Sequence, residues 1–395
     1  MIAFDEAIGL IRSVATPLET EVVALAEAAG RVLALPVTAE IDSPLSDVSA
    51  MDGYAVREQD LNHFPVSLQL VGGSYAGSGW SGSVEAGSCV RIFTGAPVPD
   101  SADRVVIQEY VRSVDNVAVI DERPESARHI RARGSDFFQG EELLSAGRLL
   151  DPRALVTAAG ADVAEVEVYR RPRVHILSTG DELAEPGTAR ERADAIPESV
   201  SFGVAALAAQ WGAECIGRTR VRDELAAMQA LACAAIDDAD LVVVTGGASV
   251  GEKDFAKAMF EPLGLHLVFS KVSIKPGKPV WLGRAGEKLV IGLPGNPTSA
   301  LVTARLFLAP LLAGLTGRPG DEALRWRTVP LGSPLGPCGS RDTFHRARWV
   351  GDRAEILAFQ DSSSQKALAE AELLVRQYAD SRALEPGSQV EGLDF

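Results

Sequence analysis

The order of apolar and polar positions divides the chain of 395 residues into stretches with different periodicities. Helical spacing runs through residues 3–35 and returns over residues 138–170, where Asp151 followed by Pro152 marks a typical helix start. We therefore expect residues 1–40 and 138–170 to pack together as a helical linker and dimerisation domain.

Residues 41–137 lie between these two stretches and have a different texture. Short β-like runs alternate there with glycine-rich turns, which predicts an inserted β-rich domain. Asp52 lies on a tight turn of this insert, between Met51 and Tyr54. Asp136 follows a second, glycine-containing loop, and its position suits a helix cap better than a metal ligand.

Residues 171–318 alternate strand-like apolar runs with helical segments, which indicates a doubly wound α/β domain with a parallel sheet. In such sheets ligands bind at the carboxyl ends of the strands. The loops that fall at these ends combine glycine with hydroxyl and acidic or amide side chains, and they span residues 178–182, 245–254 and 292–299. Residues 319–395 follow as a smaller β-rich, barrel-like domain, so we expect an elongated, multi-domain combination of α/β and β folds.

The stretch from Lys271 to Ser299 concentrates positive charge beside rigid turns. Only seven of the 38 basic residues are lysines, and Lys271, Lys275 and Lys278 fall within eight residues. Proline and glycine fix the backbone of such turns, and lysine presents a compact point charge. The pattern favours a site for phosphate or a small oxyanion over a solvated charged loop.

Carboxylates accompany the strand-end loops, whereas histidine and cysteine do not. Asp181, Glu182, Asp223 and Asp254 offer oxygen ligands of the kind that Mg²⁺ takes together with substrate phosphates. This combination favours metal-assisted cleavage or exchange at a phosphate over a nucleophilic triad. The glycines of residues 245–254 match neither the dinucleotide fingerprint nor the P-loop, so both of these folds are rejected.

Composition narrows the function classes further. The net charge of −16 argues against a general nucleic-acid binder and against a protein of anionic membranes. The four cysteines show no paired metal spacing, and neither a signal peptide nor an apolar run near 18 residues is recognised, so we expect a cytoplasmic protein.

In combination, these motifs resemble the MoeA/gephyrin E-domain family of molybdopterin molybdenumtransferases. The matching segments follow the family order and are Ser49–Ala55, Thr94–Pro99, Ile130–Asp136, Ser178–Leu183, Thr245–Asp254, Lys271–Pro279 and Leu293–Pro297. The resemblance implies an L-shaped homodimer of four-domain chains. It also implies an enzyme that inserts molybdenum from molybdate into adenylylated molybdopterin, with Mg²⁺ present and AMP released, alongside other molybdenum cofactor biosynthesis proteins.

The resemblance also implies roles for residues at matched positions. The residues implied to bind molybdate or phosphate are Lys275, Lys278 and Ser299. The implied catalytic residues are Asp52, Asp136, Glu182, Asp223, Asp254, Lys271 and Lys275, with Asp223 and Asp254 as metal ligands. The implied substrate-binding residues are Thr179, Gly180, Gly246, Gly247, Ser249, Pro294, Gly295, Asn296 and Pro297. Asp52 and Asp136 belong to the β-rich arm, which in this family reaches the partner's site.

One departure from the family pattern keeps alternatives open. Members usually carry Asp-Ser/Thr-Asn before the helix near residue 198, where this chain has Glu198-Ser199-Val200. Val200 either packs the helix or faces the substrate without the hydrogen bonds that an amide would make. The chain could thus be a divergent paralogue that binds molybdopterin as a scaffold. Hydrolysis of a nucleotide-like pyrophosphate is another alternative, and adenylylation of molybdopterin fits less well because its enzymes lack the β-rich arm.

Overall fold

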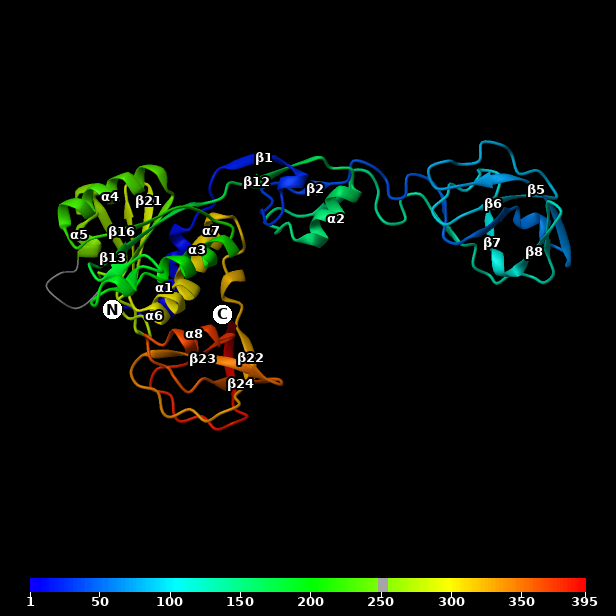
Figure 1. The fold of residues 1–395 in the computed structure, drawn as a ribbon. Coiled ribbons are helices and arrows are strands. Elements are labelled where there is room, and N and C mark those ends of the chain that lie inside the picture. The colour runs from blue at the N-terminus through cyan, green and yellow to red at the C-terminus, as the bar shows by residue number, and fades with distance from the viewer. Residues whose placement is uncertain (248–254) are drawn as a thin grey trace.

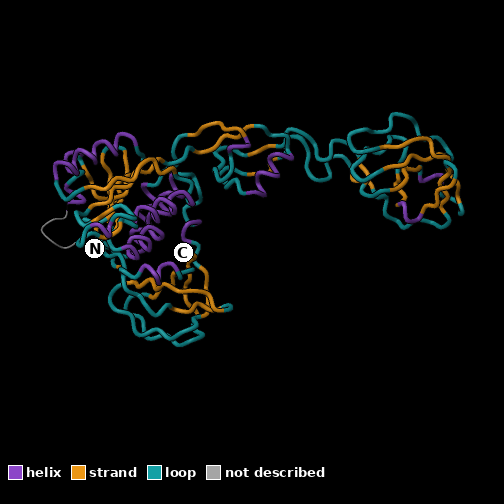
Figure 2. The backbone as a smooth tube through the Cα atoms, viewed as in Figure 1, coloured by secondary structure: helices purple, strands orange, loops and turns teal. Residues whose placement is uncertain are grey.

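The computed structural model describes residues 1–247 and 255–395 and shows an elongated chain of four units (Figure 1). An α/β domain and a β-rich C-terminal domain lie together at one end. A narrow linker unit leads from them to a β-rich arm at the other end, as the strands in Figure 2 show. The predicted elongated combination of α/β and β domains is confirmed.

The α/β domain is organised around one large sheet. Its strands are β13 (Arg173–Thr179), β16 (Glu214–Val221), β17 (Leu241–Thr245), β18 (Leu265–Ser270), β20 (Trp281–Ala285) and β21 (Lys288–Leu293). Their order is β16-β13-β17-β21-β20-β18, and the first four run parallel. Strands β20 and β18 pair antiparallel, so the sheet is mixed and not purely parallel as predicted. The reason is local, because only Gly286 and Glu287 join β20 to β21, and a parallel crossover needs a dozen or more residues.

Helices cover both faces of this sheet (Figure 1). They are α1 (Phe4–Val14), α3 (Val200–Gln210), α4 (Leu225–Asp238), α5 (Phe255–Ala258), α6 (Pro297–Thr303) and α7 (Ala309–Leu315). A π-helical turn, Ala304–Leu308, joins α6 to α7 into one apolar helix. By length and composition Pro297–Leu315 could cross a membrane, but 94% of its apolar window is buried inside the protein.

The first helix lies outside the linker unit with which the sequence grouped it. Phe4, Ile8 and Ile11 on α1 share one hydrophobic core with Val174 and Ile176 of β13. The apolar stripe of α1 is buried against the α/β domain because that domain offers the larger uncovered apolar face.

The linker unit itself contains β1 (Thr20–Ala24), β2 (Val37–Thr38), β11 (Glu142–Leu144), β12 (Glu165–Tyr169) and α2 (Pro152–Gly160). The helix predicted to continue through residue 35 is therefore wrong, since Thr20–Ala24 pairs antiparallel with β12. β-branched residues, which favour strands, occupy several of these positions. The predicted start of α2 is confirmed, because the Asp151 side chain accepts a hydrogen bond of 2.9 Å from the Ala154 N–H.

The arm contains the β-rich sheet that was predicted for the insert. Its strands are β4 (Gly53–Val56), β5 (Val66–Ser74), β6 (Ser88–Ile92), β7 (Arg104–Ile107), β8 (Val111–Val114) and β9 (Val117–Ile120), in the order β7-β4-β6-β5-β9-β8. The neck of the arm pairs β3 (Val48–Ser49) with β10 (Ile130–Arg131). No helix begins at Asp136, so the cap predicted there is wrong. The Asp136 N–H instead bonds the Ser43 carbonyl at the neck.

The C-terminal domain is joined to the α/β domain through a shared sheet. Its elements are β22 (Arg327–Pro330), β23 (Asp342–Val350), β24 (Arg353–Ile356), α8 (Gln365–Ala369), β25 (Leu373–Gln377) and β26 (Gln389–Asp394). A short strand from the lysine-rich stretch, β19 (Ile274–Lys275), pairs parallel with β23. This pairing fixes the C-terminal domain beside the ligand-binding edge of the α/β sheet.

Candidate functional site

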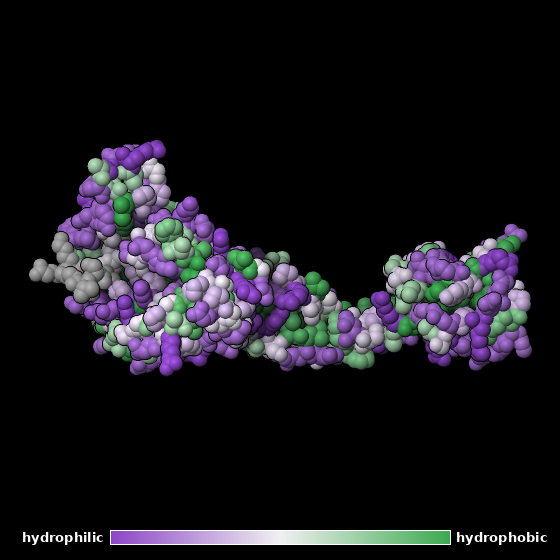
Figure 3. Space-filling view, turned by 90° about the horizontal axis from the view of Figure 1, so that it is seen from below, coloured by the Kyte–Doolittle hydropathy of each residue, from purple (hydrophilic) through white to green (hydrophobic). Residues whose placement is uncertain are grey.

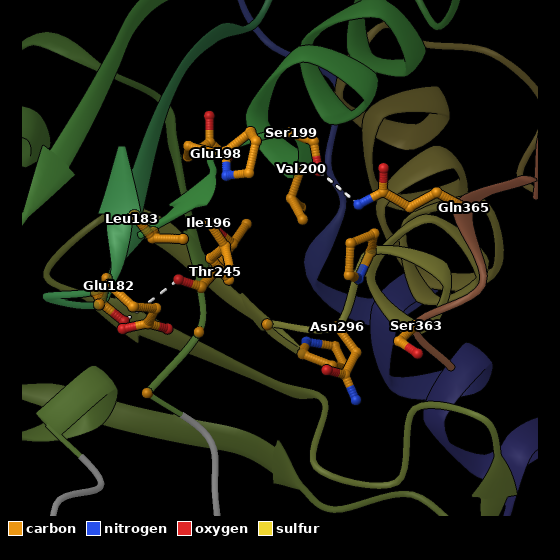
Figure 4. Close-up of a pocket in the computed structure, with 18 of the residues that line it drawn as sticks. Glu182, Leu183, Ile196, Glu198, Ser199, Val200, Thr245, Asn296, Ser363 and Gln365 are labelled. Atoms are coloured by element: carbon orange, nitrogen blue, oxygen red, sulfur yellow. Dashed lines mark hydrogen bonds between the residues drawn. The ribbon is translucent and has the colours of Figure 1, made fainter. Parts of the chain in front are cut away.

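A cavity of about 740 Å³ opens at the carboxyl ends of β13, β17 and β21 (Figure 4). The three loops predicted at this edge meet there, joined by a segment before α3 and by a loop of the C-terminal domain. The sequence-predicted residues in the lining are Thr179, Gly180, Glu182, Asp223, Gly246, Gly247, Pro294, Gly295, Asn296 and Pro297. The predicted residues Ser249 and Asp254 lie outside the described part of the chain.

Close backbone packing brings these loops together. Gly246 has a φ of +89°, and a Cβ added to it would lie 2.6 Å from the Thr179 carbonyl oxygen. A Cβ on Gly295 would lie 3.3 Å from the Gly246 Cα, so the loops after β17 and β21 also touch. Only glycine fits the Gly246 position without strain. The contacts leave a floor of backbone against which a ligand can pack closely.

Glu182 and Asp223 are two of the three carboxylates that line the cavity, and Glu198 is the third. Glu182 follows β13, and Asp223 lies between β16 and α4. Asp181 does not line the cavity but accepts a hydrogen bond of 3.2 Å from the Asp223 N–H. The pair Glu182 and Asp223 fits Mg²⁺, which is commonly bound by one or two carboxylates plus substrate phosphates. Within residues 1–247 and 255–395, no three His, Cys, Asp or Glu side chains form a metal-binding group.

An apolar wall lies beside Glu182 and was not predicted (Figure 4). The short strands β14 (Leu183–Ala184) and β15 (Ile196–Pro197) pair parallel, so Leu183 and Ile196 both reach the cavity. Glu198 follows them at 5% exposure, and its carboxylate accepts 2.8 and 2.5 Å hydrogen bonds from the N–H and Oγ of Ser201. The Glu198 side chain thus satisfies a backbone N–H in the first turn of α3.

Val200 combines the two alternatives that the sequence left open. It lines the cavity, and it is also only 7% exposed within the hydrophobic core of the α/β domain. The position therefore packs α3 and borders the ligand space at the same time.

The C-terminal domain contributes Ser363 and Gln365 to the lining. Their loop is fastened by Arg346, which is 1% exposed and donates hydrogen bonds of 3.1 Å to Thr298 Oγ1 and to the carbonyls of Phe359 and Asp361. Sequence reasoning missed these residues because serine-rich segments usually read as turns.

The lysines are separated from this cavity. Lys275 lines a second cavity of about 360 Å³ with Arg341 and His345, whereas Lys271 and Lys278 are exposed and line neither cavity. Burial lowers the pKa of His345, the hydrogen bond between its Nε2 and the Gln377 Oε1 raises it, and the charge of Lys275 lowers it.

Ser299, which the sequence predicts to bind molybdate or phosphate, does not line the main cavity. The residue is 6% exposed within the first turns of α6 and lies outside the cavity lining. Its side chain is buried because α6 packs into the core of the α/β domain.

The two acids of the arm lie far from their own chain's cavity (Figure 1). Asp52 accepts hydrogen bonds of 2.8 Å from both the N–H and the Oγ1 of Thr94. These bonds hold the pKa of Asp52 below its usual value. Asp136 is exposed at the neck, where Arg131 precedes it on β10.

Comparison with known proteins places both matched parts of the chain in one family. Residues 2–161 match the MoeA N-terminal region (domain I and II), and residues 175–314 match the probable molybdopterin binding domain. A molybdopterin molybdenumtransferase of Haemophilus influenzae is 38% identical over 332 residues, which cover 84% of this chain and 80% of that protein. That of Bacillus subtilis is 31% identical, covering 99% of this chain and 94% of that protein.

Solved structures agree with the sequence matches. A molybdopterin biosynthesis MoeA protein from Pyrococcus horikoshii superposes with a TM-score of 0.85 at 26% identity, with 100% of both chains covered. Another structure of a molybdopterin biosynthesis MoeA protein from Pyrococcus horikoshii gives a TM-score of 0.83 at 28% identity, covering 99% of this chain and 98% of the other. The resemblance read from the sequence is thereby confirmed, and the chain belongs to the molybdopterin molybdenumtransferase (MoeA) family.

Proposed function

We propose that this chain inserts molybdenum from molybdate into adenylylated molybdopterin and releases AMP. The observation that carries the proposal is the composition of the cavity, which joins a glycine floor, an apolar wall and carboxylates that include Glu182 and Asp223. A flat heterocycle fits the apolar wall, and backbone N–H groups of glycine loops suit phosphates. The chain is similar to molybdopterin molybdenumtransferases, and molybdopterin is the compound that their name gives.

Glu182 and Asp223 would hold Mg²⁺ beside the pyrophosphate of the substrate. When bound, Mg²⁺ neutralises phosphate charge and polarises a phosphoryl oxygen. The chain supplies positioning and charge and needs no nucleophilic side chain, because molybdate itself brings the reacting oxygen.

Lys275 and Lys278 would hold molybdate next to the main cavity. They flank the turn that ends at Pro279, and Pro279 lines the cavity that holds the substrate. The second cavity, lined by Lys275 and Arg341, contains no carboxylate among its lining residues and so suits an oxyanion. In a chain of net charge −16, such a local positive site is needed to attract an anion.

We also propose that the working form is a homodimer in the cytoplasm. Asp52 directly precedes β4 of the arm, which lies at the opposite end of the molecule from the α/β domain that holds the cavity (Figure 1). Apolar surface along the linker unit and the neck is visible in Figure 3. The exposed large apolar residues of these segments include Val22, Leu35, Leu45, Phe138 and Val156. Exposed apolar surface of this kind marks protein contacts, and a second copy of the chain would bring its arm to the cavity.

The decisive experiment supplies adenylylated molybdopterin, Mg²⁺ and molybdate and follows the release of AMP. We expect AMP release that depends on molybdate and a pterin product that contains molybdenum. Binding without turnover would support the scaffold alternative instead. Turnover of ATP or a nucleotide sugar without molybdate would support a pyrophosphate-cleaving enzyme.

A further inference from the structure

Gln365 lies where the C-terminal domain meets the cavity of the α/β domain (Figure 4). It is the first residue of α8, and its Nε2 reaches the Ser199 Oγ at 3.3 Å, across 166 residues of sequence. Ser199 directly precedes Val200, which presents an apolar side chain at the start of α3. The contact therefore places an amide at the corner of the cavity where α3 itself offers no polar group at position 200.

The loop that leads to Gln365 is fixed at several points. The Thr298 N–H bonds the Ser362 carbonyl at 3.1 Å, and Thr298 Oγ1 bonds the Ser364 carbonyl at 3.3 Å. Arg346 also holds this loop, because it donates hydrogen bonds to the Phe359 and Asp361 carbonyls. A side chain held by a loop with this many contacts is pre-organised, which lowers the entropy that a ligand contact would cost.

The lining contains only one other side-chain amide among the described residues, that of Asn296. Its Nδ2 is already committed to the Ser362 Oγ at 3.0 Å, so it helps to dock the C-terminal loop. Gln365 contacts a hydroxyl that belongs to the cavity rim, and a hydroxyl can rotate to a new partner. Of the two amides, Gln365 is thus the one that can turn to a ligand without releasing the loop.

We propose that Gln365 is a specificity-determining residue that reads the polar edge of the substrate's heterocycle; this rests on the proposed function. The edge of a pterin carries an amine and a lactam, which alternate hydrogen-bond donors and acceptors. A carboxamide both donates and accepts, and glutamine binds such edges of nucleobases with two hydrogen bonds. The ring face would pack on Leu183, Ile196 and Val200, and the edge would meet the amide from the C-terminal domain.

The test compares steady-state kinetics of the wild type and Gln365→Leu with adenylylated molybdopterin, Mg²⁺ and molybdate. Leucine keeps the bulk and removes the amide, so we expect KM for the pterin substrate to rise about three- to tenfold with kcat unchanged. Lys366→Ala is the matched control, because Lys366 is exposed on the same helix and does not line the cavity. Both variants are expected to melt at the wild-type temperature.

A second variant separates recognition from support of the loop. Val200→Asn in the Gln365→Leu background places an amide at the same corner from α3, and we expect it to lower KM again. A KM rise that Val200→Asn does not reverse, together with a lower melting temperature of the Gln365→Leu single variant, would show that Gln365 only holds the loop and would overturn the inference. An unchanged KM in Gln365→Leu would overturn it as well. A wild type without turnover would instead refute the proposed function, and this inference with it.

Discussion

At the scale of single residues, the lysine-rich turn borders one cavity with a charged side chain and the other with a proline. Lys275 is exposed and borders the carboxylate-free second cavity, whereas Pro279 of the same turn borders the main one. A proline-rich turn that touches both cavities fixes the distance between an oxyanion held by Lys275 and a substrate in the main cavity. The role of this lysine is therefore to hold charge at a set place.

Lys275→Ala is expected to lower the molybdate-dependent rate roughly 100-fold, because removal of one group that stabilises developing negative charge commonly has this effect. The fold should survive, since Lys275 is exposed. AMP release measured against molybdate concentration, with a thermal melt of each protein, checks the prediction. Lys366→Ala serves as the control for loss of an exposed lysine. A Lys275→Ala enzyme with the wild-type rate would remove this residue from the oxyanion site.

Gly292 has a packing role, although the sequence places it beside the ligand loop. It pairs with Trp281 across β20 and β21, and a Cβ on it would lie 1.9 Å from the Trp281 Nε1. Trp281 is fully buried, so the ring cannot move aside. The glycine lets the indole lie flat against the strand that leads to the cavity.

Gly292→Ala should therefore destabilise the protein by about 1–3 kcal/mol, the usual cost of overpacking a core. Trp281→Phe in the same chain should recover part of this loss, because the smaller ring leaves room for the methyl group. Thermal or urea unfolding of the single and double variants measures both effects. Gly9→Ala is the matched control: no heavy atom lies within 4 Å of its added Cβ, and alanine in α1 should raise stability. Additive effects of the two core substitutions would contradict the proposed clash.

At the scale of elements, the loop over residues 359–365 turns the C-terminal domain into a wall of the cavity. Arg346 on β23 is the group that holds it, with hydrogen bonds to Thr298 and to two carbonyls of the loop. Burial lowers the pKa of Arg346, while Asp361 opposes this shift. The guanidinium is thus a structural connection between two domains at the cavity.

Arg346→Leu is expected to release the loop, lower the melting temperature and raise KM for the pterin substrate more than it changes kcat. Hydrogen bonds to charged groups contribute about 1.5–3 kcal/mol each, so the loss should be measurable by unfolding as well as by kinetics. Arg348→Leu on the same strand is the control, because Arg348 is exposed. If both variants behave alike, the loop does not depend on the buried guanidinium.

The elements also show which structure a sequence can predict. The α2 start and the buried strands of the α/β domain follow from neighbouring residues, through a cap and through apolar runs. Strand β1 was predicted as helix because its partner, Tyr169 opposite Thr20, lies far along the chain and five residues cannot define a period. Pairing, and not local spacing, decides such a segment.

The candidate site likewise contains residues that the sequence predicts and residues that it does not. Because ligands bind at the carboxyl ends of parallel strands, the sequence predicts that the glycine loops and Asn296 lie together. Gln365 and Ser363 reach the same cavity from another domain, and Ser362 meets Asn296 across 66 residues. No local pattern announces such a contact, because it depends on how β19 pairs with β23.

At the scale of the whole molecule, a cluster of charges fastens the linker to the α/β domain. Arg170, which follows β12, donates hydrogen bonds of 2.7 and 3.0 Å to the two carboxylate oxygens of Asp240. It also bonds Glu19 at 2.9 Å, and Glu19 directly precedes β1. The Arg170 guanidinium therefore ties the linker ribbon to Asp240, the residue that precedes β17.

Asp240→Asn should lower stability at neutral pH by roughly 1–2 kcal/mol, because the pair is partly screened by solvent. Burial raises the pKa of Asp240, but hydrogen bonds from Arg170 and from the Arg173 N–H outweigh it, so the pKa is lowered. The stabilisation is thus complete above about pH 4, the unfolded pKa, and is lost as pH falls through the lowered folded value. Melting of both proteins across this range should show the difference shrinking in acid. The exposed Asp237→Asn is the control, and a difference that persists at low pH would contradict the ion pair.

The arrangement of the arm gives the last prediction, which concerns the proposed dimer. If Asp52 serves the partner's cavity, mixed dimers of Asp52→Ala and Asp223→Ala chains contain one complete site, formed by the intact arm of one chain and the intact cavity of the other. Random exchange of two inactive proteins should then restore about one quarter of the wild-type activity, since half of the dimers are mixed and each has one working site. If Asp52 instead serves its own chain, every chain carries one defect and no activity returns. Exchange is verified by two affinity tags, and mixed dimers without activity would place Asp52 outside the partner's site.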